Sequence, residues 1–124
     1  MKQSMKTVLI VEDNEINMLL ENDIVTNLGY KTICVSNGEE ALAIAPDAKP
    51  HLILMDIQLS GVDGLSATIK LKANPQTADI PIIAVSAYAF ERDIQQALRA
   101  GCDDYLVKPI DYETFVKTIK KYLD

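Results

Sequence analysis

Nearly continuous apolar runs alternate along this chain with segments whose apolar positions recur at helical spacing. Runs without polar alternation are typical of strands buried on both faces of a sheet. They are clearest over residues 7–11, 51–56 and 80–86. Shorter strands are expected at residues 32–35 and 105–107. The pattern therefore predicts five strands, three of them deeply buried.

A helix is predicted after each strand, and glycine and proline mark most of the boundaries. The first ends at Gly29, the second is stopped by Pro46 and Pro50, the third covers about 65–72 before Pro75, and the fourth ends at Gly101. The expected inward positions are Ile16, Leu20, Ile24 and Leu28, then Ala41, Leu42 and Ala45, then Ile94, Ala97 and Leu98, and finally Tyr112, Phe115, Val116, Ile119 and Leu123.

Five strand–helix units predict an α/β fold, a single doubly wound five-stranded parallel sheet with helices on both faces. Right-handed crossovers allow the strand order 2-1-3-4-5. We favour this order because it brings Glu12, Asp13 and Asp56 together where the strand order reverses. The strand order is therefore inferred from the expected functional site. One domain is expected over residues 6–124, preceded by a flexible extension, residues 1–5.

Charged residues stand where three of these strands end. Asp56 closes the run from His51, Glu12 and Asp13 follow the first strand, and Lys108 follows the fifth. A carboxylate at the end of a buried strand is costly unless it is paired or binds a metal. The carboxyl ends of parallel strands are also where ligands bind in such sheets. The sequence thus predicts a site for a cation and a phosphoryl group around Asp56.

Composition excludes several classes of protein. The chain has 124 residues, 48% of them hydrophobic and 24% charged, which is typical of one globular domain. A net charge of −6 argues against a nucleic-acid surface. No apolar run reaches the ~18 residues of a membrane helix, and no signal peptide is recognisable, so we expect no membrane association and a cytoplasmic location. Cys34 and Cys102 lack the spacing of a disulfide framework or zinc site.

Four motifs in this order resemble the receiver domain of two-component response regulators. They are Val11-Glu12-Asp13-Asn14, Leu54-Met55-Asp56, Ala84-Val85-Ser86-Ala87 and Val107-Lys108-Pro109. The resemblance extends from Val8 to Leu123 and implies the CheY-like, flavodoxin-like fold. The segments 11–17 and 56–59 are most similar to single-domain cell-cycle regulators of the DivK type. Receivers of hybrid histidine kinases share the first of these segments.

The resemblance implies a phosphorelay function with Mg²⁺ as cofactor. Asp56 would accept a phosphoryl group from phosphohistidine and become an aspartyl phosphate. Asp13, Asp56 and the backbone carbonyl of Gln58 would bind Mg²⁺, with Glu12 acting through a water. Magnesium prefers oxygen ligands and retains several waters, so this set is sufficient.

The remaining motif residues also receive roles from the resemblance. Lys108 would neutralise a phosphoryl oxygen, and the family places a cis peptide before Pro109. Ser86 would donate to the phosphoryl group. Tyr105 resembles the family's switch aromatic, and the exposed apolar loop Ala87-Tyr88-Ala89-Phe90 would form part of a partner-binding face.

Simpler structural interpretations exist for each residue taken alone. A strand-end aspartate can cap a turn, Glu12 and Asp13 can form a solvated loop, and Ser86 can begin a turn. Tyr105 could equally be a half-buried strand tyrosine, and the only histidine, His51, is interpreted as a strand-start residue.

The chain departs from the family pattern after Asp56. Ser60 stands where receivers usually have a proline, which changes the stiffness expected of that loop. Gln58 and Tyr88 occupy variable positions that influence acyl-phosphate hydrolysis in the family. None of the expected ligands is altered.

Two other functional classes place similar residues on this architecture. An aspartate-nucleophile phosphatase of the haloacid dehalogenase type needs a second aspartate where this chain has Gln58. A nucleotide- or flavin-binding module needs a glycine-rich loop after the first strand, where this chain is acidic.

We therefore expect no turnover enzyme beyond the domain's own phosphotransfer and dephosphorylation. The expected partners are a histidine kinase or phosphotransfer protein as donor and a downstream kinase or regulator as target. No output domain is expected after the last helix, and the alternative is a receiver taken from a hybrid kinase.

Overall fold

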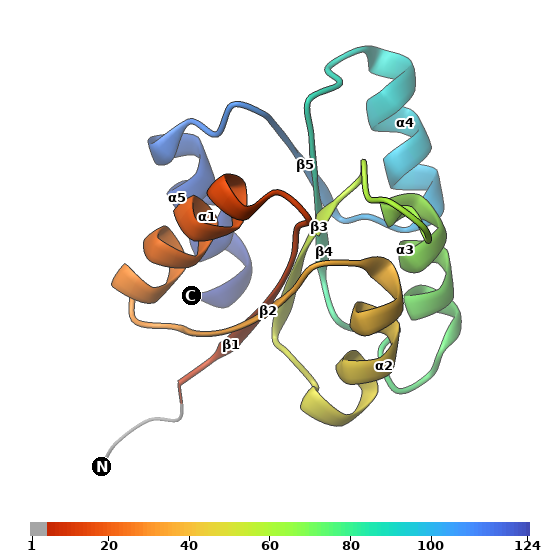
Figure 1. The fold of residues 1–124 in the computed structure, drawn as a ribbon, viewed down its shortest axis with the longest axis horizontal. Helices are drawn as coiled ribbons and strands as arrows, with labels where there is room; N and C mark the ends of the chain where they lie inside the picture. Colours follow the sequence, from red (N-terminus) through yellow and green to blue (C-terminus); the bar gives the residue numbers. More distant parts are fainter. Residues whose placement is uncertain (1–4) are drawn as a thin grey trace.

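All five predicted strands form and join one parallel sheet (Figure 1). The structure, a computed structural model, describes residues 5–124. The strands are β1 (Thr7–Val11), β2 (Lys31–Val35), β3 (Leu52–Asp56), β4 (Ile82–Ser86) and β5 (Asp104–Val107). Their order is β2-β1-β3-β4-β5, which confirms the predicted topology and its reversal between β1 and β3.

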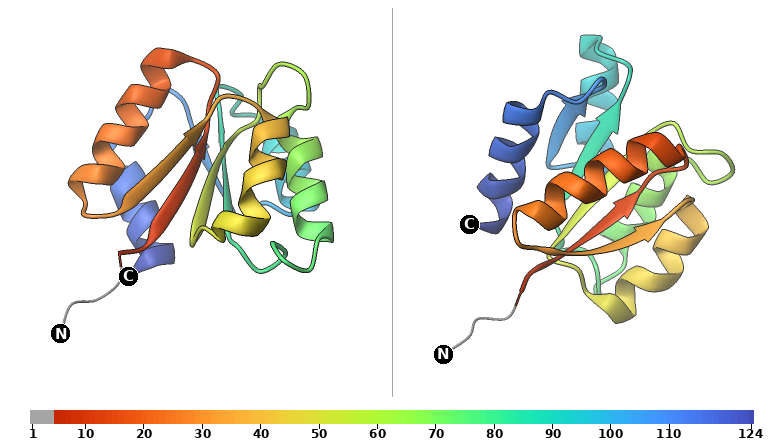
Figure 2. Two further views of the ribbon diagram at one scale, coloured as in Figure 1. Left: turned by 60° about the horizontal axis from the view of Figure 1, so that its bottom comes forward. Right: turned by 60° about the vertical axis from the view of Figure 1, so that its left-hand side comes forward.

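Five helices cover the two faces of the sheet (Figure 2). They are α1 (Glu15–Asn27), α2 (Gly38–Ala48), α3 (Gly64–Ala73), α4 (Glu91–Ala100) and α5 (Tyr112–Leu123). Polar side chains at Asn14, Asn37, Asp63 and Asp111 accept backbone N–H groups in the first turn of α1, α2, α3 and α5. These caps satisfy donors that a helix start leaves unpaired, and so define where each helix begins.

Alternation along the strands divides the core into two layers. Leu9, Ile53 and Met55 pack toward α2, α3 and α4, whereas Ile10, Leu54 and Val85 pack toward α1 and α5. Because every residue of β3 and β4 is buried, these central strands are rigid supports for whatever their carboxyl ends carry.

Several sequence predictions about the helices are wrong in detail. Pro46 does not stop α2, which continues to Ala48. Its missing N–H removes one hydrogen bond near the helix end, while buried Ala41 and Ala45 hold the helix on the sheet. The last turn persists because Lys49 N–H donates to the Ala45 carbonyl over 2.9 Å.

The inward face of α1 also differs from the predicted one. Ile24 is buried as expected, but Ile16 is 78% exposed and Leu20 is also exposed. A row of residues four apart drifts around a helix that has 3.6 residues per turn. The face that packs on the sheet therefore contains Met18, Glu21, Ile24, Val25 and Leu28.

Smaller boundary differences follow local chemistry. β4 begins at Ile82, directly after Pro81, which has no N–H for the ladder. β5 begins one residue early, at Asp104. Leu98 and Tyr112 are exposed although their helices were predicted to turn them inward. Of the predicted extension, residues 1–4 lie outside the described residues. In residues 5–124, no helix is long and apolar enough to cross a membrane.

Candidate functional site

The register of the parallel strands places four polar residues side by side at one edge of the sheet. Val11 pairs with Met55, Asp56 with Val85, and Ser86 with Val107. Glu12 and Lys108 come one residue beyond their strands, and Lys108 N–H donates to the Ser86 carbonyl over 2.8 Å. Neighbouring strands end at the same level in the sheet. The four side chains at these ends, Glu12, Asp56, Ser86 and Lys108, therefore lie close together.

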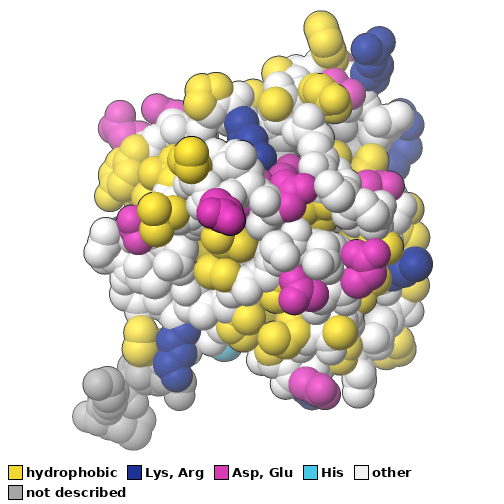
Figure 3. All heavy atoms as spheres, in the orientation of Figure 1, with side chains coloured by type: hydrophobic (Ala, Val, Ile, Leu, Met, Phe, Trp, Pro, Cys, Tyr) yellow, Lys and Arg dark blue, Asp and Glu magenta, His cyan; other side chains and the backbone are white. Residues whose placement is uncertain are grey.

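Glu12, Asp13 and Asp56 form an acidic cluster. Each offers a carboxylate oxygen within 4.8 Å of the other two. Asp56 is only 3% exposed and Glu12 2%, whereas Asp13 is open to solvent. Acidic side chains gather near the middle of the molecular face seen in Figure 3. Three carboxylates this close repel one another unless a cation or a proton lies between them.

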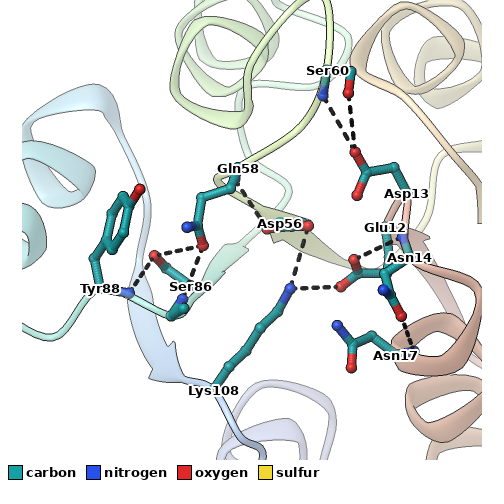
Figure 4. Close-up of polar contacts among 11 residues, drawn as sticks. Glu12, Asp13, Asn14, Asn17, Asp56, Gln58, Ser60, Ser86, Tyr88 and Lys108 are labelled. Carbon is teal, nitrogen blue, oxygen red and sulfur yellow. Dashed lines mark hydrogen bonds and ion pairs between the residues drawn. The ribbon is translucent and has the colours of Figure 1, made fainter.

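Lys108 partly neutralises this cluster (Figure 4). Its ammonium nitrogen lies 3.1 Å from Glu12 Oε1 and 3.3 Å from Asp56 Oδ2. Burial opposes the charge of Lys108, but the attraction of Asp56 and Glu12 outweighs it and raises the lysine pKa. The contact with Glu12 is an ion pair rather than an aligned hydrogen bond. The Lys108–Pro109 peptide bond is cis, as the resemblance implies.

Asp13 is held from the other side by the loop that follows β3. Ser60 donates to Asp13 Oδ2 from its backbone N–H over 3.3 Å and from its hydroxyl over 3.5 Å. A proline at this position could supply neither donor. The departure of Ser60 from the family pattern thus adds contacts to the acidic cluster.

A fourth acid, Glu21, was missed by the sequence analysis. It lies on the buried face of α1, 1% exposed, within hydrogen-bonding reach of Glu12. Burial, and then the charge and hydrogen bond of Glu12, raise the pKa of Glu21 to about 9. Glu21 Oε2 is buried and has no hydrogen-bond partner in the described part of the chain, so the raised pKa agrees with a carboxyl group that keeps its proton.

The pKa of Glu12 is also raised, first by burial and then by Asp56.

The sequence signal that could have revealed Glu21 was its position one helical turn from both Met18 and Ile24. The predicted row of apolar residues four apart does not contain Glu21. Glu21 is therefore recognised only when the face of α1 that packs on the sheet is known.

A separate hydrogen-bond chain runs from the end of β3 to the loop after β4. Asp56 Oδ1 accepts from Gln58 N–H over 3.0 Å, and Gln58 Oε1 accepts from Ala87 N–H over 2.9 Å. Gln58 Oε1 also accepts from the Ser86 hydroxyl over 3.3 Å. Gln58 thus connects Asp56, through its backbone N–H, with Ser86, through its side-chain oxygen (Figure 4).

The chain continues to the predicted switch aromatic. Tyr88 N–H donates to Ser86 Oγ over 3.0 Å, and the Tyr105 hydroxyl donates to the Tyr88 carbonyl over 2.7 Å. Tyr105 is half-buried, while the side chains of Tyr88 and Phe90 are exposed. The structure therefore connects Tyr105 to the strand-end site through backbone and hydroxyl groups.

Close backbone packing holds the loop behind Asp56. A Cβ on Gly64 would lie 2.7 Å from Ile57 Cα and would also overlap the Asp56 carbonyl oxygen. Only glycine allows α3 to start against the end of β3 in this way. The position of Asp56 thus depends on a residue that carries no chemistry itself.

Other reactive residues do not join the site. His51 Nδ1 accepts from Thr7 N–H over 3.0 Å at the opposite end of β3, as expected for a strand-start residue. Cys34 is exposed, Cys102 is buried, and both are free thiols. The site therefore consists of carboxylates, one ammonium and a hydroxyl, a set that suits a hard cation and a phosphoryl group.

The chain resembles known signalling proteins over almost its whole length. Residues 8–120 match the family described as the response regulator receiver domain. The polar-differentiation response regulator DivK of Brucella anthropi is 48% identical over 118 residues, covering 95% of this chain and 96% of that protein. DivK of Brucella ovis is equally similar over the same lengths.

Solved structures agree with this relationship. The receiver domain of the sensor histidine kinase PA1611 from Pseudomonas aeruginosa, with a magnesium ion in its active-site cleft, superposes with a TM-score of 0.89. It is 32% identical, covering 97% of this chain and 98% of that one. The chemotaxis protein CheY4 of Vibrio cholerae gives a TM-score of 0.90 at 25% identity, covering 96% of this chain and 99% of that one.

Proposed function

Because this chain belongs to the response regulator receiver domain family, we propose that it accepts a phosphoryl group from phosphohistidine onto Asp56. The observation that carries the proposal is the environment of Asp56. Its carboxylate is buried at a strand end, 3.3 Å from the Lys108 ammonium and within the acidic cluster. The Asp56 carboxylate is thus paired with the Lys108 ammonium, and with Glu12 and Asp13 it can also hold a metal cation.

In the proposed transfer, an Asp56 oxygen forms a bond to phosphorus as the phosphorus–nitrogen bond of the donor histidine breaks. The imidazole leaves with the electron pair of that bond. Lys108 stabilises a phosphoryl oxygen as negative charge spreads over the transferring group. Ser86 and the Ala87 N–H supply donors on the β4 side of the site.

The acidic cluster fits Mg²⁺ by its chemistry. Its donors are all oxygens, and within residues 5–124 Lys108 is the one cation paired with it. Asp13, Asp56 and the Gln58 carbonyl would hold the ion, with Glu12 acting through water. When bound, Mg²⁺ supplies positive charge that offsets carboxylate repulsion and stabilises phosphoryl oxygens.

Signalling would follow from phosphorylation-dependent binding rather than from turnover of a substrate. We infer that a histidine kinase or histidine phosphotransfer protein is the donor, and that a downstream kinase or regulator in the cytoplasm is the target. The exposed side chains of Tyr88 and Phe90, with Ala87 and Tyr105, provide the binding face. Tyr88 and Tyr105 connect this face to the site, because they join the hydrogen-bond chain that starts at Ser86.

Phosphorylation by a small donor tests the proposal directly. The chain is incubated with phosphoramidate, with and without Mg²⁺, and its intact mass is measured. We expect one phosphoryl group, absent in Asp56→Asn and absent without a divalent cation. A phosphoryl group on Ser86 or His51, or an unmodified wild-type chain, would exclude Asp56 as the acceptor. Continuous turnover of a phosphate monoester would favour the phosphatase class instead.

A further inference from the structure

The side-chain amide of Gln58 faces two hydrogen-bond donors at the end of β4. Its oxygen accepts from Ala87 N–H and from the Ser86 hydroxyl, over 2.9 and 3.3 Å. A backbone N–H can only donate, so the amide atom that faces Ala87 must be the oxygen. Ser86 is fully buried, and its hydroxyl gains its acceptor in this contact. The amide therefore satisfies donors that would otherwise need another partner.

The same donors lie where a phosphoryl group on Asp56 would need them. Asp56 pairs with Val85 in the sheet, so Ser86 and Ala87 come directly after the residue beside it. Gln58 N–H already donates to Asp56 Oδ1, and the Gln58 side chain extends from there toward Ser86 (Figure 4). A phosphoryl oxygen and an amide oxygen are both acceptors, and they cannot occupy one position together.

We infer that the Gln58 amide oxygen stands in for a phosphoryl oxygen before phosphorylation, and must leave Ser86 and Ala87 when Asp56 is phosphorylated. This inference rests on the proposed role of Asp56. Gln58 is thereby a positioning residue that sets the rate of phosphorylation, since its two hydrogen bonds must break before the phosphoryl group gains the same donors.

The structure provides space for the displaced side chain. A cavity of about 250 Å³ adjoins Gln58 and is lined also by Asp63, Ser86, Tyr88 and Asp93. Ile57, Leu65 and Tyr105 also line this cavity, and the polar groups of Asp63, Asp93 and Gln96 can bond to the amide when it turns away from β4. Displacement therefore needs a side-chain rotation and no movement of the sheet.

Gln58 also links the site to the aromatic face before any phosphoryl group is present. Tyr88 N–H donates to Ser86 Oγ, and the Tyr105 hydroxyl donates to the Tyr88 carbonyl. With Gln58 bound to Ser86 and Ala87, the donors of this loop have an acceptor before phosphorylation, but that acceptor belongs to Gln58 and not to Asp56. The exchange of one acceptor for another is then the first event that the aromatic face can sense.

Rates of phosphorylation in two variants test the inference. Gln58→Ala removes the amide, while Gln58→Met keeps a side chain of similar length but has no carbonyl acceptor. Both are measured by intact mass with phosphoramidate at saturating Mg²⁺, because the backbone carbonyl of Gln58 is a proposed ligand. We expect both variants to react about 2- to 10-fold faster than the wild type, which corresponds to the loss of about one net hydrogen bond.

Amide NMR gives a second measurement that does not depend on rate. In the unphosphorylated chains, the Ala87 N–H resonance of Gln58→Met should differ from that of the wild type, because its acceptor is gone. After phosphorylation the two resonances should converge, since the phosphoryl oxygen becomes the acceptor in both chains.

The outcomes separate this inference from the proposed function. A wild-type chain that takes no phosphoryl group overturns both. Phosphorylation of Asp56 that is unchanged or slower in Gln58→Met overturns only the role of the amide. A faster reaction in Gln58→Ala alone shows that the side chain acts by its bulk, which also overturns the acceptor role. Ala87 N–H resonances that are identical in Gln58→Met and the wild type before phosphorylation would also overturn the acceptor role of the amide.

Discussion

The ammonium of Lys108 lies 3.3 Å from Asp56 Oδ2, and the two residues come from the ends of strands that are not neighbours in the sheet. β4 lies between them, and its last residue, Ser86, accepts the Lys108 N–H at its carbonyl. The lysine thus reaches across β4 to the buried carboxylate. Among residues 5–124, Lys108 is therefore the one cation that offsets the charge of these carboxylates.

Replacement of Lys108 by methionine should reduce phosphorylation of Asp56 by about 100-fold or more, because one preorganised charge is lost from the site. Without Mg²⁺ the variant should also be about 1–3 kcal/mol less stable, since Glu12 and Asp56 remain buried without their cation. Phosphoramidate kinetics and urea denaturation measure the two effects.

Lys121→Met is the matched control for Lys108→Met. Lys121 pairs with Asp104 over 3.4 Å on the surface, where an ion pair contributes little. Equal losses of stability in the two variants would contradict the role assigned to Lys108.

Stability should fall as pH rises between about 5 and 9 in the absence of Mg²⁺. The pKa of Glu21 is raised from 4.5 to about 9 by burial and by Glu12, so between these values the folded chain retains a proton that the unfolded chain releases. The unfolding free energy then decreases with pH, with a slope of up to ~1.4 kcal/mol per pH unit. Urea titrations at several pH values measure it.

Glu21→Gln should flatten this pH profile, because an amide carries no proton to lose. The exposed Glu113→Gln should leave the slope as it is in the wild type. If Glu21→Gln retained the full slope, another group would be responsible for it.

Millimolar Mg²⁺ should raise the unfolding free energy by about 1–3 kcal/mol, since an ion that binds only the folded chain stabilises it by mass action. Asp13→Asn should remove most of this gain, because it takes one carboxylate from the cluster. Thermal melting with and without Mg²⁺ measures the effect, and Asp23→Asn on exposed α1 surface is the control. An identical Mg²⁺ response in Asp13→Asn would argue against the proposed ligand.

Gly64→Ala should destabilise the fold by about 1–3 kcal/mol and slow phosphorylation, because the new methyl group would push on the backbone of Asp56 and Ile57. Gly29→Ala is a useful comparison: Gly29 has a φ of +98° but nothing within 4 Å of an added Cβ. It should lose stability without losing reactivity. Denaturation and phosphoramidate kinetics distinguish the two, and equal rates in both variants would count against the close approach.

Ser86→Ala should leave Asp56 able to accept a phosphoryl group while weakening the response of the aromatic face. The hydroxyl connects Gln58 to Tyr88, and Tyr88 in turn accepts from Tyr105. Amide chemical shifts at Tyr105 and in α4 should therefore change less on phosphorylation than in the wild type. Changes of full size in Ser86→Ala would show that the signal takes another route.

The sequence alone determined the architecture and the main polar residues of the site. Continuous apolar runs required a sheet covered on both faces, and such a sheet brings its strand ends to one edge. Glu12, Asp13, Asp56, Ser86 and Lys108 are each attached to a strand end. Their convergence therefore follows from local pattern and chain order.

The tertiary structure decided what depends on packing between elements. The rotation of α1 against the sheet buried Glu21 and exposed Ile16. Contacts of α1 with β1 and β2 determine which face of the helix turns inward, and the row of apolar residues four apart does not. Pro46 is tolerated because buried alanines hold α2 in place. Gln58 reaches Ser86 and Ala87 only because β3 and β4 end side by side, a contact over 28 and 29 residues of sequence that no local pattern encodes.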